Sequence, residues 1–179
     1  PDFFSDVHIR RAFSYAFDYD TFIEQVLLGY GFQVPSVIPK GLLGFNEDLP
    51  MYSFDLEKAK EEFQEAWDGE VWEKGFKLTL LYNTGNEERQ TACEMLKEHI
   101  ESLNPKFKIE VQGLQWPTYL DAYRSGQLPA FFIGWQADYP DPHNFIFTYF
   151  HSNGVYGTTQ GQAFIDFARE NLDSLVEKA

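Results

Sequence analysis

The alternation of strand-like and helix-like segments between residues 76 and 135 is the feature that most constrains the fold. Short runs of apolar or alternating residues predict strands at Phe76–Tyr82, Phe107–Leu114 and Pro129–Trp135. Helical patterns connect them at Glu87–Leu103 and Thr118–Arg124. Because helical connections pair successive strands in parallel through right-handed crossovers, the pattern predicts an α/β fold. We expect a mainly parallel β-sheet flanked by helices.

Helices are also expected on both sides of this alternation. Capping residues and apolar stripes predict them at Asp6–Asp18, Asp20–Leu28, Asp55–Trp67, Pro142–Phe150 and Gln162–Lys178. The stretch from Gly29 to Pro50 is rich in glycine and proline, and we expect it to be an ordered but irregular excursion. The sequence contains no internal repeat and no convincing linker. We therefore expect residues 1–179 to form a single α/β lobe.

Composition narrows the classes of function. The net charge is −14, from 28 acidic and 14 basic residues, which argues against a nucleic-acid partner because few basic side chains are available for phosphates. Aromatic residues make up 18% of the chain, more than a core requires, so some rings should line a ligand surface. One cysteine and four histidines without a metal-ligand spacing predict neither a metal centre nor a cofactor. No apolar run is long enough to predict a membrane span.

The candidate site lies where the last predicted strand gives way to a helix. The apolar run ends at Trp135, and Asp138 and Tyr139 follow it in a turn. Asp141 and Pro142 are then typical of a helix N-cap followed by proline at the first helical position. Ligands of open parallel sheets bind at the carboxyl ends of the strands. We therefore predict an aromatic wall beside a carboxylate, which suits a cation or a polar, flat-faced solute.

Trp116 and Tyr119 follow the strand predicted at residues 107–114 and would extend this wall, although packing is the simpler interpretation for both. Structural alternatives exist for the other candidates as well. Asp138 also fits a solvated turn carboxylate or a second helix cap, which is the simpler interpretation when the residue is taken by itself. Trp135 also fits a core position, and Tyr139 fits a residue that shapes the turn.

Five blocks of the sequence, in the same order, carry a resemblance to a known family. They are Val7-His8-Ile9-Arg10-Arg11-Ala12-Phe13-Ser14-Tyr15-Ala16-Phe17-Asp18, Gly29-Tyr30-Gly31 with Pro35 and Ile38-Pro39, Phe54-Asp55 with Lys58-Ala59-Lys60, Trp116 with Leu120 and Gly126, and Gly134-Trp135-Gln136-Ala137-Asp138-Tyr139-Pro140-Asp141-Pro142. The last block closely resembles the Gly-Trp-x-x-Asp-Tyr-x-Asp-Pro motif of the family 5 extracellular solute-binding proteins of ABC transporters. That group includes dipeptide-, oligopeptide- and nickel-binding proteins.

The resemblance implies a lobe like those of the type II periplasmic binding proteins. The chain would be the C-terminal ligand-binding lobe of a larger two-lobe receptor, whose missing N-terminal lobe closes over the ligand. The implied function is binding of dipeptides or oligopeptides for delivery to the permease subunits of an ABC importer, without enzymatic activity. The implied location is outside the cytoplasm, in the periplasm or anchored at the cell surface, with the signal segment not included in this sequence.

In peptide-binding members the aspartate of the motif pairs with the α-amino group of the peptide. Residue by residue, that role falls to Asp138, with Trp135 beside it as a pocket wall. Tyr123 and Phe132 stand in the neighbourhood where oligopeptide-binding members place arginines, which leaves an oligosaccharide open as the ligand.

The enzymatic alternative is a glycosidase that uses Asp138 and Asp141 as its carboxylate pair and Trp135 as a sugar platform. Such an enzyme needs one carboxyl group that stays protonated as a general acid. A carboxylate that caps a helix is instead stabilised in its ionised form. The sequence therefore favours a binding protein over an enzyme.

Overall fold

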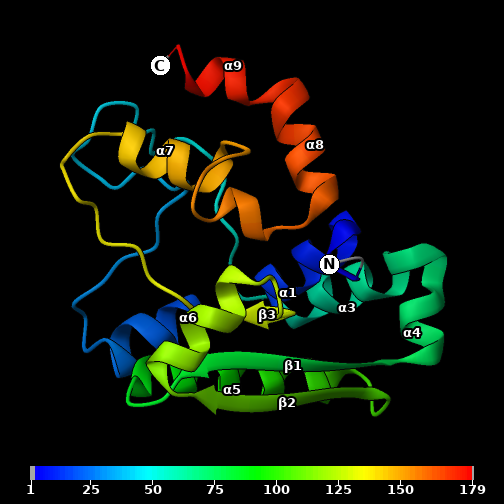
Figure 1. Cartoon of the computed structure of the whole chain (residues 1–179). Helices are drawn as coiled ribbons and strands as arrows, with labels where there is room; N and C mark the ends of the chain where they lie inside the picture. The colour runs from blue at the N-terminus through cyan, green and yellow to red at the C-terminus, as the bar shows by residue number, and fades with distance from the viewer. Residues whose placement is uncertain (1–2, 179) are drawn as a thin grey trace. The chain divides into compact units, whose positions relative to one another are not determined.

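The computed structural model describes residues 3–178, which form two compact units. Unit 1 contains residues 3–32, 52–122 and 127–133, and unit 2 contains residues 33–51, 123–126 and 134–178. Figure 1 traces the path of the chain through its helices and strands. The assignment of residues 1–179 to one lobe of a two-lobe receptor stays a prediction.

A three-stranded parallel sheet forms the centre of unit 1 (Figure 1), with the order β2-β1-β3. Its strands are β1 (Phe76–Asn83), β2 (Phe107–Leu114) and β3 (Ala130–Phe131). The predicted α/β class and the parallel pairing are confirmed. The third strand was predicted too long, because only two of its residues pair with β1, opposite Leu80 and Leu81. Trp135 consequently lies outside the sheet.

Helix α5 (Glu87–Leu103) has the predicted boundaries and packs against β1 and β2. The side chain of Asn86 accepts a hydrogen bond from the backbone N–H of Arg89 at 2.8 Å, which caps the helix start. One face of the helix is buried, through Ala92, Cys93, Leu96 and Ile100. This face enters the hydrophobic core of unit 1.

Helices α1 (Val7–Tyr15) and α3 (Leu56–Glu65) pack against each other and complete that core. Phe63 of α3 brings the helix pair to the sheet, because its ring lies 4.9 Å from that of Phe107 and 5.9 Å from that of Phe76. Burial of rings of this size is the main stabilising contribution that such a core provides.

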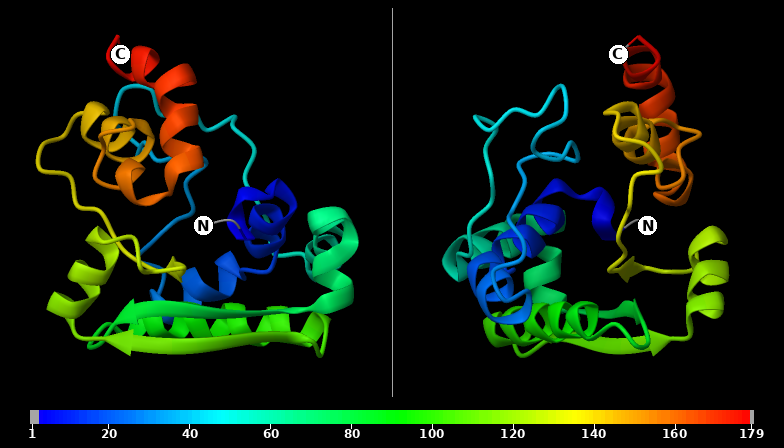
Figure 2. Two further views of the ribbon diagram at one scale, coloured as in Figure 1. Left: turned by 45° about the vertical axis from the view of Figure 1, so that its right-hand side comes forward. Right: turned by 90° about the vertical axis from the view of Figure 1, so that its left-hand side faces the viewer.

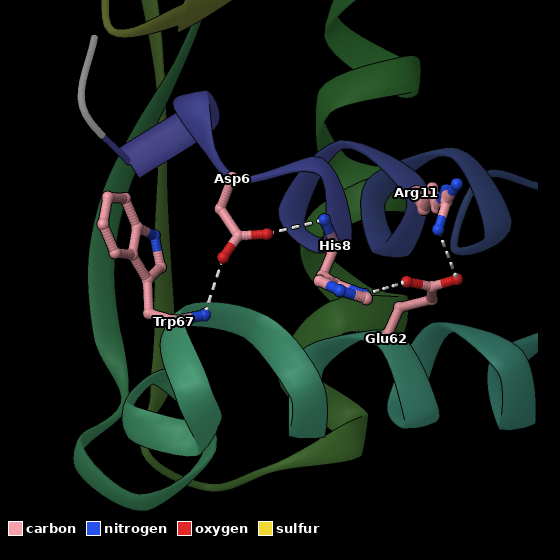
Figure 3. A network of polar contacts seen from close by, with 5 residues as sticks. All are labelled: Asp6, His8, Arg11, Glu62 and Trp67. Atoms are coloured by element: carbon pink, nitrogen blue, oxygen red, sulfur yellow. Dashed lines mark hydrogen bonds and ion pairs between the residues drawn. The ribbon is translucent and has the colours of Figure 1, made fainter.

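Asp6 connects the start of α1 to the turn after α3 (Figure 3). One carboxylate oxygen accepts the N–H of His8 and the other accepts the N–H of Trp67, both at 2.7 Å. Trp67 and Asp68 adopt left-handed backbone angles, with φ of 50° and 54°. The predicted helix 55–67 therefore ends at Glu65, because the chain turns to bring the Trp67 N–H to Asp6.

The remaining elements of unit 1 are short. They are η1 (Phe3–Ser5), α2 (Tyr19–Thr21), the π-helical turn η2 (Phe22–Val26), the 3-10 turn η3 (Ala66–Gly69), α4 (Glu70–Lys74) and α6 (Trp116–Arg124), whose last two residues belong to unit 2. The helix predicted at 20–28 is thus divided between α2 and η2. Helix α4 was not predicted.

Unit 2 contains α7 (His143–Phe150), η4 (Gly157–Thr159), α8 (Gln162–Asn171) and α9 (Asp173–Val176). Residues 33–51 hold no helix or strand, as expected for the glycine- and proline-rich stretch (Figure 2). The last helix was predicted as continuous from 162 to 178, but it breaks at Leu172, where φ is −114°. No helix within residues 3–178 combines the length and apolar character needed to cross a bilayer.

Candidate ligand-binding site

Trp135 and Asp138 are held together by a side chain from α7. The carboxamide oxygen of Asn144 accepts the indole N–H of Trp135 at 2.9 Å and the backbone N–H of Asp138 at 3.3 Å. Asn144 is the second residue of α7 and is only 6% exposed. The structure therefore brings together the two residues that the sequence placed at the centre of the site.

An aromatic cluster supports the Trp135 ring. Tyr156 meets it edge to face, with ring centroids 5.9 Å apart and an interplanar angle of 76°. The Tyr156 hydroxyl donates to the carbonyl of Gly134 at 3.0 Å, and its ring stacks on Tyr149 at 4.7 Å. Trp135 is half-buried in this arrangement, so its indole is both packed and partly open.

Hydroxyl groups in this cluster stay protonated. Burial raises the pKa of Tyr123 and of Tyr149 above the usual value of a phenol. The Tyr123 hydroxyl donates to the carbonyl of Val155. Tyr123 therefore acts as a hydrogen-bond donor that fixes the loop, and neither tyrosine brings a charge to the site.

The carboxylate of Asp138 is exposed, and among residues 3–178 it has no hydrogen-bond or ion-pair partner. It is not a helix cap, because the side chain of Asp141 accepts the N–H of His143 at 2.8 Å. Helix α7 begins at His143, one residue later than predicted. Of the alternatives for Asp138, the second cap is thus wrong, whereas a solvated carboxylate and a ligand contact both fit.

Tyr139 is 47% exposed, and its hydroxyl lies 3.1 Å from Nδ1 of His143, the first residue of α7. Its carbonyl also accepts the backbone N–H of Asp141 at 2.9 Å, which closes the turn. Both contacts are those of a residue that shapes the turn.

Trp116 and Tyr119 lie in unit 1, whereas Trp135 and Asp138 lie in unit 2. The two α6 rings stack, with centroids 5.9 Å apart and an interplanar angle of 14°. Tyr119 has no exposed surface, and its hydroxyl donates to the carbonyl of Phe132 at 2.8 Å. These contacts favour the packing interpretation for Tyr119, while Trp116 remains 44% exposed.

Sequence reasoning missed Asn144 and Tyr156. An asparagine in the first turn of a helix is usually solvated, and a tyrosine in a glycine-bearing loop carries no functional signal of its own. Their importance comes from contacts with residues 6 to 22 positions away in the chain. Among the described residues, no three His, Cys, Asp or Glu side chains are grouped to hold a metal ion.

Comparison with protein families gives a match over most of the chain. The family model described as bacterial extracellular solute-binding proteins, family 5 Middle, matches residues 1–157. The dipeptide-binding protein of Escherichia coli is 29% identical over 178 residues, which cover 97% of this chain and 32% of that protein. Heme-binding protein A of Haemophilus influenzae is 25% identical over 176 residues, with coverages of 98% and 31%. The chain thus spans about a third of the length of the curated relatives it matches.

Solved structures show the same fold. HbpA2 from Haemophilus parasuis superposes with a TM-score of 0.78 at 25% identity, covering 98% of this chain and 34% of that one. DppA from Helicobacter pylori, in complex with the peptide STSA, gives a TM-score of 0.76 at 21% identity, covering 99% and 35%. These likenesses confirm the predicted fold of a type II periplasmic binding protein.

Proposed function

Because this chain belongs to the family 5 bacterial extracellular solute-binding proteins, we propose that it is part of the receptor of an ABC importer for dipeptides or oligopeptides. Relatives named as dipeptide- and oligopeptide-binding proteins support this ligand class. The chain supplies one ligand-binding lobe, and a second lobe of the same protein closes over the peptide. The receptor acts outside the cytoplasm and delivers its ligand to the permease subunits.

The observation that carries this proposal is the exposed, unpartnered carboxylate of Asp138, whose backbone N–H shares the Asn144 oxygen with the Trp135 indole. A carboxylate that no neighbouring cation neutralises is available for the α-amino group of a peptide. The resulting charge-assisted hydrogen bonds strengthen when the closing lobe excludes water. Trp135 then offers an apolar ring for the first residues of the peptide.

Two other functions receive less support. Of the two aromatic side chains that left an oligosaccharide open, Tyr123 is buried and its hydroxyl is bonded to Val155, so it offers no open face to a sugar ring. A glycosidase would need a general acid opposite Asp138, yet the Asp141 carboxylate is engaged with the first turn of α7. Binding without catalysis fits the site better.

The proposal is tested by the substitution Asp138→Ala in the full-length receptor. We expect affinity for a tripeptide with a free amino terminus to fall by about 2–4 kcal/mol, because the ammonium loses its charged partner. The N-acetylated tripeptide should bind the variant and the wild type equally. Calorimetric titration measures both affinities.

Asp166→Ala is the matched control, because Asp166 is an exposed aspartate of α8 in the same unit. It should leave the affinity unchanged. Unaltered binding of the free peptide by the Asp138→Ala receptor would contradict the role of Asp138. Binding of an oligosaccharide in place of both peptides would contradict the ligand class.

A further inference from the structure

Asn144 joins the two candidate ligand contacts through a single atom. Its carboxamide oxygen accepts from the side chain of Trp135 and from the backbone of Asp138. We propose that Asn144 is the positioning residue of the site, which sets the distance between the aromatic wall and the carboxylate. This inference rests on the proposed peptide-binding function, and it concerns the selection of a free amino terminus.

The chemistry of the contact requires this type of side chain. A carboxamide oxygen has two acceptor positions, and here both are filled by N–H donors. Because Asn144 is 6% exposed, little water is available to replace it. An apolar side chain at this position would leave the indole N–H and the Asp138 N–H without an acceptor. Each unpaired donor then costs the free energy of its desolvation.

Asn144 is itself fixed by its backbone, whose N–H donates to the carbonyl of Asp141 at 3.1 Å. Its carbonyl accepts the hydroxyl of Thr148 at 2.5 Å, one helical turn further along. The carbonyl of Thr148 in turn accepts the backbone N–H of Tyr156 at 2.9 Å, and Tyr156 packs on the Trp135 ring. Trp135 thus contacts two residues that are both attached to α7. Asn144 belongs to that helix, and Tyr156 is bonded to it through Thr148.

The position of Asn144 matters for selection because a peptide ammonium must meet the Asp138 carboxylate while the adjoining residue meets the Trp135 ring. If the loop shifts, either contact can still form alone, but the two no longer form together. An acetylated peptide loses the ammonium contact and depends on the ring only. The ratio of the two affinities therefore reports the positioning directly.

The experiment uses the full-length receptor as the wild type and as three variants. Asn144→Leu removes the acceptor at similar volume, and Asn144→Asp keeps two acceptor positions. Asn171→Leu is the matched control, because Asn171 is an exposed asparagine of α8 that bonds only the carbonyl of Phe167. Each receptor is titrated with a free tripeptide and with its N-acetylated form.

We expect the preference of Asn144→Leu for the free peptide to fall by about tenfold or more, the equivalent of one to two hydrogen bonds. Asn171→Leu should keep the wild-type preference, and Asn144→Asp, which keeps the acceptor oxygen and adds a negative charge, should keep or raise it. A general loss of receptor stability would lower the affinities for both peptides together and leave the ratio of the two affinities unchanged. An unchanged ratio in folded Asn144→Leu overturns the inference while the proposed function stands.

A second measurement separates the inference from the proposed function. In the ligand-free receptor, exchange of the Trp135 indole proton and the Asp138 amide proton with solvent is followed by NMR. Both protons should be protected in the wild type and in Asn144→Asp and lose protection in Asn144→Leu. If the wild type binds neither peptide, the proposed function fails, and these two protons alone decide the positioning role. Rapid exchange of both protons in the wild type would overturn the positioning role of Asn144.

Discussion

Cys93, the only cysteine of the sequence, lies on α5 with no exposed surface. Burial raises the pKa of its thiol to about 12, and the nearby charge of Glu94 adds to the shift. Because the thiolate is the reactive form, a protonated and buried thiol is inert. Its chemistry therefore depends on whether unit 1 is folded.

We expect Cys93 to resist iodoacetamide at pH 8 in native buffer and to react fully in denaturant. Mass spectrometry measures the extent of alkylation as the denaturant concentration rises, and the labelling transition should coincide with the loss of far-UV circular dichroism. Rapid labelling without denaturant would show that α5 opens far more readily than its packing against β1 and β2 suggests.

Asp6 makes the stability of unit 1 depend on pH. Burial alone would raise the pKa of its carboxyl, but hydrogen bonds from the backbone N–H groups of Trp67 and His8 outweigh burial and lower it. A carboxyl whose pKa is lower in the folded state contributes stability above the unfolded-state pKa of about 3.9. That contribution is lost as the pH falls through the folded-state pKa.

Asp6→Ala should therefore destabilise the protein at pH 7 by about 1 kcal/mol, the usual effect of removing a helix cap. The difference from the wild type should shrink between pH 5 and pH 2, because acid protonates the wild-type carboxyl. Urea denaturation across this range measures it. A difference that does not vary with pH would mean that the carboxylate charge is not what joins α1 to the turn at Trp67.

At the scale of elements, a comparison of two glycines distinguishes the cost of backbone strain from the cost of a steric clash. Gly75 joins α4 to β1 with φ of 74°, and a Cβ there would lie 2.4 Å from the carbonyl oxygen of Lys106. Gly85 lies in the turn between β1 and α5 with φ of 83°, and a Cβ there would meet nothing within 4 Å. Both positions favour glycine, but only the first is also crowded.

Gly85→Ala should lower the free energy of unfolding by about 1–2 kcal/mol, the cost of a left-handed alanine. Gly75→Ala should cost more, since the backbone of residue 106 must also move. Chemical denaturation of both variants gives the comparison. Equal losses would show that the chain before β2 moves at Lys106 without cost, which contradicts a rigid junction between α4 and the sheet.

The boundaries of α5 and β2 could be predicted from the sequence because local signals specify them. Asn86 caps α5, four residues at helical spacing face the core, and β2 begins with alternating buried and exposed side chains. The residues within each of these elements mark where it begins and show the spacing of its buried side chains. The parallel pairing of the strands followed from the helical connections between them, whereas their order was not predicted.

Elements that depend on distant residues could not be predicted in the same way. The apolar run after Pro129 has no alternation that marks where pairing with β1 stops, so β3 was predicted to reach Trp135. The break between α8 and α9 is accompanied by bonds from Ser152 to the Asp173 carboxylate, across 21 residues. For the same reason the site motif located Asp138 and Trp135, whereas Asn144 became visible only through its contacts.

For the whole molecule, the division of the chain into two compact units could not be predicted from the sequence. The chain passes between the units five times, at residues 32–33, 51–52, 122–123, 126–127 and 133–134. None of these positions has the composition of a linker, and two of them enclose a segment of only four residues, 123–126. A contiguous reading of the sequence therefore predicts one lobe, although the contacts form two compact units.

This interleaving has a consequence for biosynthesis. Residues 33–51 are translated early, yet most of unit 2 begins at residue 134, which is 83 positions after residue 51. At the usual 5–20 residues per second, the ribosome needs roughly 4–17 s to cover that gap. During this interval the segment, which includes Ile38 and Leu42, both half-buried in the folded chain, has no completed unit to join. The nascent chain thus carries apolar side chains that chaperones can bind until the last helices have been made.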